Sequence, residues 1–193
     1  MALRRRSRQK AGVTVTPDTF TMVQFDHALI LATVQRLVDQ LGIVGGVRVE
    51  IDETTPLGRA ALASLDPLVL SVEGGGIEDP KRPRQAAEHR VVDLIGRLLL
   101  QARDRLDADF GAPALSEDIA LAHQVAWDVH TLGRLERLGH PAQRQRRLYH
   151  FRNRHGFTDA ADEAFERLWS ADRLTWVKIT DLSDRASAAR QSA

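Results

Sequence analysis

The segment 144–156 concentrates the side chains of this sequence that could do chemistry. It contains five arginines, two histidines and two aromatic residues, with no acidic residue. Arginine guanidinium groups bind phosphates and carboxylates, and aromatic rings stack on nucleic-acid bases. The composition therefore predicts a surface for an acidic partner, either nucleic acid or protein, with Arg144, Arg147, His150 and Arg154 as binding residues.

A second basic and aromatic group lies on a predicted helix that begins at Ser116. Trp127, His130 and Arg134 are spaced three and four residues apart, and His123 and Arg137 continue the series on either side. Residues at these spacings share one face of an α-helix. Trp127, His130 and Arg134 are candidate residues of the same partner-binding surface. Packing of this face under a neighbouring helix is nevertheless the favoured interpretation.

Acidic residues that follow the basic segment offer an internal partner for its charge. Residues 159–172 contain Asp159, Asp162, Glu163, Glu166 and Asp172. An antiparallel pair of helices would bring these carboxylates to the arginines. Since the formal net charge is only +1, pairing within the chain is the favoured interpretation, and a binding surface is the leading functional hypothesis.

His89 and Asp93, four residues apart on a predicted helix, could supply two metal ligands. The order of the predicted elements is similar to that of small zinc peptidases. Where such a peptidase carries HExxH, however, residues 88–93 read Glu-His-Arg-Val-Val-Asp, without the second histidine or the glutamate base. The sequence therefore gives no family, and a solvent-exposed stripe of His89, Asp93 and Arg97 is the favoured explanation of the spacing.

Other kinds of catalytic site find little support in the sequence. There is no cysteine, which excludes disulfides, thiolate metal sites and a cysteine nucleophile. The run Gly74-Gly75-Gly76 lacks the Gly-Lys-Ser/Thr of a phosphate loop, and no serine lies in a nucleophile-elbow pattern. With 5% aromatic residues there is little material for a stacked cofactor, so we expect no cofactor and no metal.

Composition and length predict a folded, soluble protein. The chain has 193 residues, of which 43% are hydrophobic and 27% charged, within the range of ordinary globular domains. Of its 27 basic residues only Lys10, Lys81 and Lys178 are lysine, which leaves 24 arginines. No apolar run reaches the length of a signal peptide or of a membrane-spanning helix. We therefore expect a cytoplasmic protein without a membrane partner.

The N-terminal third is predicted to form a small sheet with one or two helices. Residues 1–12 read as a disordered basic arm, and residues 13–24 as one strand or two short ones broken at Pro17. Apolar periodicity after Asp26 predicts a helix that ends before Gly42. Further predictions are strands over 47–51 and 67–73, a short helix over 57–65, and a loop over 74–84 that is a candidate subdomain boundary or lid.

The remaining two-thirds are predicted to be helical. Helices are expected over 85–109, 116–138, 141–154, from Thr158 onward, and 174–184, with a flexible tail over 185–193. The fold class is thus α+β, a small N-terminal sheet with one or two helices followed by a four- to five-helix part, in one domain over 13–184.

Three functional hypotheses follow from these features. The first is a non-enzymatic protein that binds an acidic partner through its Arg- and His-rich helices. The second is a metal-assisted or general acid/base hydrolase that uses His89, Asp93 and histidines of the later helices. The third is a structural subunit that forms a homo-oligomer through the broad apolar faces of the helices beginning near Gln85 and Ser116.

Overall fold

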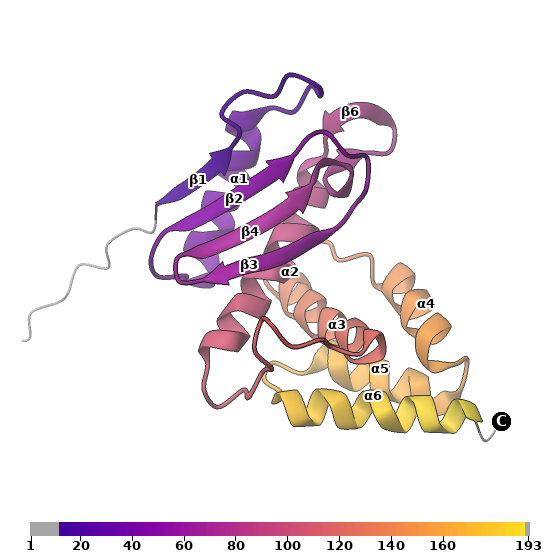
Figure 1. The fold of residues 1–193 in the computed structure, drawn as a ribbon. Helices are drawn as coiled ribbons and strands as arrows, with labels where there is room; N and C mark the ends of the chain where they lie inside the picture. Colours follow the sequence, from indigo (N-terminus) through magenta and orange to yellow (C-terminus); the bar gives the residue numbers. More distant parts are fainter. Residues whose placement is uncertain (1–11, 192–193) are drawn as a thin grey trace, which may run out of the picture. The chain divides into compact units, whose positions relative to one another are not determined.

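The computed structural model describes residues 12–191, and the chain divides into two compact units (Figure 1). The first unit ends at Val91 and the second begins at Val92, within a long helix. Loop 74–84, the predicted subdomain boundary, belongs to the first unit. The predicted basic arm lies outside the described residues, apart from Gly12.

A four-stranded sheet forms the first unit, in the order β1-β2-β4-β3. Its strands are β1 (Val13–Thr16), β2 (Val47–Asp52), β3 (Ala60–Leu65) and β4 (Leu68–Glu73). β1, β2 and β4 are parallel, and β3 is antiparallel to β4. In β2, Val47, Val49 and Ile51 are buried and alternate with exposed residues, which confirms the strand predicted from that alternation.

Helix α1 (His27–Leu41) connects β1 to β2 and packs against β1 (Figure 1). The Asp26 carboxylate accepts a hydrogen bond from the Leu29 N–H at 3.1 Å and caps the helix. Gly42, with φ of 64°, ends it in the left-handed conformation that glycine adopts without strain. Ile30, Val34 and Leu37 are buried, as the apolar periodicity predicted.

Two predictions for the first unit are wrong. Residues 60–65 of the predicted helix over 57–65 instead form the edge strand β3, because Asp66-Pro67 turns the chain back and lets β3 pair with β4. The predicted loop 74–84 contains a 3₁₀ turn (Gly74–Gly76) and a hairpin of β5 (Glu78–Asp79) and β6 (Arg82–Ala86). Pairing between segments overrides local propensity in both places.

Five helices build the second unit. They are α2 (Glu88–Leu106), whose first turn belongs to the first unit, α3 (Leu121–Arg137), α4 (Arg144–His155), α5 (Asp159–Ser170) and α6 (Trp176–Gln191). Helix α3 is central and contacts α4, α5 and α6. Trp127, Phe151, Phe165, Leu168 and Ile179 are fully buried among these helices. The predicted fold class, a small sheet followed by a helical part, is confirmed.

Several helix boundaries in the second unit differ from the predictions, among them the start of α3, the start of α4 and the end of α6. α3 begins at Leu121 rather than at Ser116, and its N-cap residue is Ala120. α6 continues to Gln191, through residues predicted to be a flexible tail. Burial of Ala186 fixes this part of α6. The N-cap at Thr158 is confirmed, since its hydroxyl accepts a hydrogen bond from the Ala161 N–H at 3.2 Å.

No helix in the described part of the chain is both long enough and apolar enough to span a membrane.

Candidate partner-binding surface on helix α4

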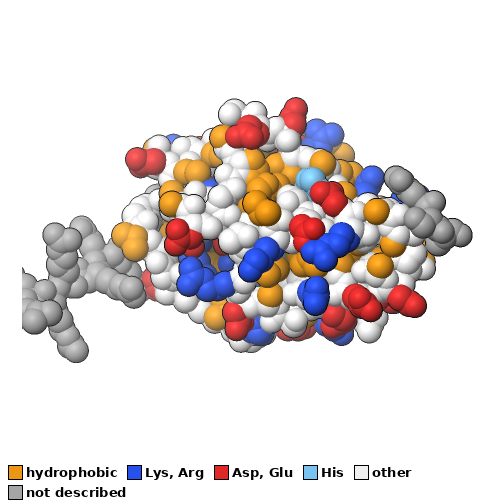
Figure 2. Space-filling view, turned by 90° about the horizontal axis from the view of Figure 1, so that it is seen from below, with side chains coloured by type: hydrophobic (Ala, Val, Ile, Leu, Met, Phe, Trp, Pro, Cys, Tyr) orange, Lys and Arg blue, Asp and Glu red, His pale blue; other side chains and the backbone are white. Residues whose placement is uncertain are grey.

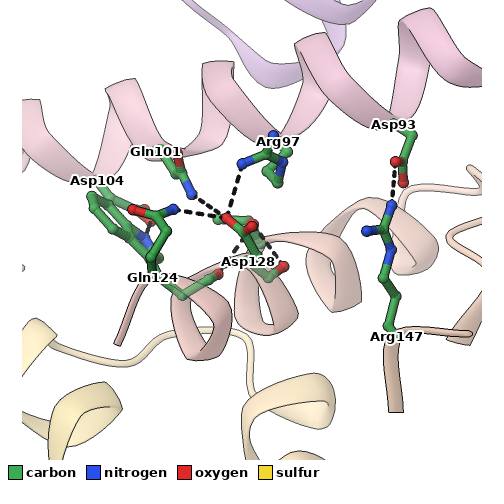
Figure 3. A network of polar contacts seen from close by, with 9 residues as sticks. Asp93, Arg97, Gln101, Asp104, Gln124, Asp128 and Arg147 are labelled. Atoms are coloured by element: carbon green, nitrogen blue, oxygen red, sulfur yellow. Dashed lines mark hydrogen bonds and ion pairs between the residues drawn. The ribbon is translucent and has the colours of Figure 1, made fainter. Parts of the chain in front are cut away.

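Three arginines of α4 are neutralised within the second unit. Arg144 pairs with Glu166, and Arg152 binds Asp162 through two hydrogen bonds of 2.7 and 2.6 Å. Both acids lie in the segment 159–172, so this part of the predicted internal pairing occurs. The third arginine, Arg147, pairs with Asp93 of α2 (Figure 3).

The ion pair between Arg152 and Asp162 shifts the pKa of both groups. Hydrogen bonding to the Asp162 carboxylate raises the pKa of Arg152, and hydrogen bonding from Arg152 lowers the pKa of Asp162. Both shifts favour the charged form of the group. Arg152 contributes no free positive charge to the surface.

The opposite side of α4 carries a different set of residues. Arg146, Tyr149, His150, Asn153 and Arg154 are all exposed and recur at spacings of one, three and four residues, which places them on one helical face. Phe157 follows one turn later and is also exposed. We call these six residues the outer face of α4. It contains no acidic residue.

The basic residues of this outer face have no ion pair within residues 12–191. Among residues 12–191 no ion pair involves Arg146, His150 or Arg154, whereas Arg144, Arg147 and Arg152 each have one. The Arg146 guanidinium donates only to the amide oxygen of Gln143, at 3.3 Å. The basic segment is thus split into a paired inner side and an unpaired outer side.

Two aromatic rings stand exposed beside these cations. Tyr149 is 58% exposed and Phe157 is 65% exposed, and their rings meet edge to face with centroids 6.0 Å apart. Gly156 positions Phe157: it has φ of 109°, and a Cβ there would lie 2.9 Å from Cβ of Arg190. Only glycine fits this turn, so the backbone holds Phe157 at the surface between α4 and α5.

The structure places the other predicted surface residues in the interior. Trp127 and His130 are fully buried, and the Arg134 side chain is 11% exposed. Both the Trp127 indole N–H and the Arg134 guanidinium donate to the Asp104 carboxylate, at 2.8 Å each. A neighbouring helix, α5, covers His130, whose Nδ1 lies 3.1 Å from the Leu168 carbonyl oxygen. This face of α3 therefore has the covered arrangement that was the favoured interpretation of the sequence.

Burial changes the protonation of His130. Because a carbonyl oxygen only accepts, Nδ1 carries the proton that binds Leu168, and Nε2 is left as an unprotonated acceptor. Among the described residues this Nε2 has no hydrogen-bond partner. Burial, reinforced by the positive charge of Arg134, lowers the pKa of His130 from 6.5 to about 4. His130 is consequently neutral at physiological pH and cannot serve as a cationic contact.

Two of the residues considered for a hydrolase or for its exposed stripe bind partners on other helices. Asp93 is held by Arg147, and Arg97 binds Asp128 of α3 at 3.0 Å, instead of forming the predicted stripe with Asp93 (Figure 3). His89 is exposed at the start of α2. In the part of the chain that the structure describes, no three His, Asp or Glu side chains gather where they could hold a metal ion.

Asp128 is the centre of a structural network instead. Its carboxylate accepts hydrogen bonds from Gln101 at 2.8 Å and from Gln124 at 2.9 Å, in addition to Arg97 (Figure 3). All three bonds go to Oδ1, and those from Arg97 and Gln101 join α2 to α3.

One serine and one histidine have the separation of a nucleophile and its base. His155 Nε2 lies 2.8 Å from the Ser183 hydroxyl oxygen, and its Nδ1 lies 3.1 Å from the Phe151 carbonyl oxygen. Both side chains are completely buried, and burial lowers the pKa of His155. A substrate cannot reach the hydroxyl, so this pair joins α4 to α6 and has no catalytic geometry.

Ion pairs also bring charges of both signs together on other parts of the surface. Figure 2, which views the molecule from below relative to Figure 1, shows basic side chains close to acidic and hydrophobic ones. Ion pairs such as Arg137 with Asp172, at 2.9 Å, illustrate this local matching.

No family model matches this chain, and the searches of curated proteins and of solved structures found no match either. Function must therefore be inferred from the side chains themselves. Sequence reasoning named His150 and Arg154 but did not include Arg146, Asn153 or Phe157 in the binding surface. Arg146, Asn153 and Phe157 lie four residues before, three after and seven after His150. These spacings match one face of a helix, and no acidic residue falls on that face, so the sequence contained a signal for them.

Proposed function

We propose that this protein binds an acidic partner through the outer face of α4 and that this binding, rather than catalysis, is its function. One observation carries the proposal: Arg146, His150 and Arg154 are exposed without an acidic partner among residues 12–191, while the other arginines of the same helix are paired. With a net charge of +1, the chain has almost as many carboxylates as basic side chains. Its carboxylates could therefore neutralise this surface, but no ion pair within residues 12–191 brings one to Arg146, His150 or Arg154.

The spacing of these residues suits an elongated ligand. Four residues of α-helix rise by about 6 Å, so Arg146, His150 and Arg154 form a row about 12 Å long. The guanidinium groups at its two ends present planar, bidentate donors that match phosphate or carboxylate. A chain with an acidic group in each repeating unit can engage both ends of such a row at once.

Folding leaves this row rigid. Phe151 and His155, on the inner side of α4, are fully buried, and Arg144 and Arg152 tie the helix to α5. Because the backbone of the binding helix is already ordered, binding costs only the ordering of exposed side chains.

Fluorescence anisotropy with the full chain tests this proposal. The labelled probes are a single-stranded oligonucleotide, a duplex of the same sequence and a polyglutamate peptide, each at low and at physiological salt. We expect at least one probe to bind at micromolar protein, more weakly as salt increases. The double variant Arg146→Gln/Arg154→Gln should weaken this binding by about tenfold or more.

A matched control separates the surface from overall charge. Arg185→Gln with Arg48→Gln also removes two positive charges, but Arg185 is paired with Asp181 and Arg48 with Glu50. This control should bind within about twofold of the unaltered protein. Absence of salt-sensitive binding to all three probes, or equal losses in the two double variants, would contradict the proposal.

A further inference from the structure

We infer that the acidic partner is a single-stranded nucleic acid, whose bases stack on Tyr149 and Phe157 while Arg146 and Arg154 bind its phosphates. This inference rests on the proposed function and specifies its ligand. The observation that carries it is the exposed aromatic pair beside the unpaired basic row, with Tyr149 on α4 between Arg146 and Arg154 and Phe157 just beyond the end of the helix.

The two rings are exposed but held in place. Tyr149 stands on α4 itself, and Phe157 is fixed by the turn at Gly156. The Arg152 guanidinium lies 6.0 Å from the centre of the Phe157 ring and is itself anchored by Asp162. Phe157 is thus supported from one side by Tyr149 and from another by Arg152, so that little side-chain entropy is lost when a ligand contacts it.

Exposed rings favour a ligand with flat faces of its own. Nucleic-acid bases stack on aromatic side chains whatever their sequence, because every base has a π-face. An acidic peptide would satisfy Arg146 and Arg154 but has no repeating flat group for Tyr149 and Phe157. The two rings would then stay exposed to water and would add nothing to the binding free energy.

A single strand fits this surface better than a duplex. In a duplex the base faces are stacked on one another and cannot reach a protein ring, whereas an unpaired strand can splay its bases outward. Asn153 lies on the same face, one turn beyond Tyr149, with an exposed amide that both donates and accepts hydrogen bonds. Such a group can contact the edge of a base that has left its stack.

The charged and aromatic contacts predict separate experimental signatures. Each stacked base is expected to contribute enough that Tyr149→Ala or Phe157→Ala weakens single-strand binding about tenfold, with little change in salt dependence. Two phosphate contacts to a single strand give a slope of roughly −1.4 in log K against log salt concentration, and Arg146→Gln/Arg154→Gln should remove most of it.

The test measures anisotropy of a labelled oligothymidine of about twelve nucleotides, of the corresponding duplex and of polyglutamate. Variants are Tyr149→Ala and Phe157→Ala, with Val177→Ala as control because Val177 is an apolar side chain of α6 that is 72% exposed. Thermal unfolding of each variant verifies that it is folded. We expect the single strand to bind most tightly, and both aromatic variants, unlike the control, to weaken it.

The possible results separate this inference from the proposed function. If polyglutamate or the duplex binds more tightly than the single strand, or if both aromatic variants bind the single strand normally, the inference is wrong. The proposed function still stands in those cases, provided that Arg146→Gln/Arg154→Gln weakens the binding that is seen. If no probe binds, both are wrong.

Discussion

Acidification should destabilise the helical unit through the buried histidine His130. A proton added to its Nε2 would create a charge in a fully buried site, close to the guanidinium of Arg134. The hydrogen bond from Nδ1 to the Leu168 carbonyl is already made by the neutral ring, so protonation gains no new partner among the described residues. These features underlie the lowered pKa of about 4.

The sign and size of the effect follow from linkage. Between pH 6.5 and pH 4 the unfolded chain binds a proton at His130 and the folded chain does not, so the free energy of unfolding decreases as the pH falls. The stabilisation is fully present above pH 6.5. With about 1.4 kcal/mol for each pH unit in this window, His130 alone should remove about 2.5 kcal/mol between pH 7 and pH 4.5.

Urea unfolding followed by tryptophan fluorescence measures this difference. Trp127 and Trp169 are buried in the same helical unit and report on its unfolding. His130→Leu, which cannot titrate, should be less stable at pH 7 because the Leu168 carbonyl loses its donor. Between pH 7 and pH 4.5, however, the variant should lose about 2.5 kcal/mol less than the unaltered protein.

Comparison of the two proteins isolates the histidine. Carboxylates and His155, whose pKa burial also lowers, contribute to the pH dependence of both proteins. Their effects cancel when the pH-induced losses are subtracted. Equal losses in His130→Leu and the unaltered protein would refute the assignment of His130 as a buried neutral group.

Three further substitutions test the packing of the helical unit. Asp104→Ala leaves the buried guanidinium of Arg134 without its carboxylate and should lower the free energy of unfolding by about 3 kcal/mol, and an effect below 1 kcal/mol would show the pair to be dispensable. Gly133→Ala places a Cβ against the backbone carbonyl of Trp169 and should lower the melting temperature by about 5 °C or more, whereas an unchanged melting temperature would contradict the close approach of α3 and α5. Thr158→Ala removes the N-cap of α5 and should cost about 1 kcal/mol in urea unfolding, while Thr158→Ser should restore most of it.

Much of the secondary structure could be predicted from the sequence because its signals are local. Asp26 and Gly42 bound α1, and strict alternation marks β2, since caps and periodicity depend only on neighbouring residues. Residues 57–65 show where local signals fail. Their propensity suggested a helix, and pairing with β4 made them a strand.

The candidate site could be predicted only in part. The sequence identified α4 as the helix with an excess of arginine, but it could not divide that helix into an inner and an outer side. Arg147 pairs with Asp93 of α2, which lies more than 50 residues away in the sequence. Trp127 and His130 had the spacing of a surface stripe, and the packing of α5 on α3 buried them.

The sequence by itself thus determined that this cysteine-free α+β chain has a basic and aromatic helix, because residue types and helical spacing are properties of the sequence. Which charges remain free was decided by tertiary structure alone. Ion pairing depends on distances of a few ångströms between side chains from different helices, and these distances arise only when the helices pack. Arg146 and Arg154 stay unpaired because their side of α4 has no acidic neighbour among the described residues, whereas Arg144 and Arg152 face α5.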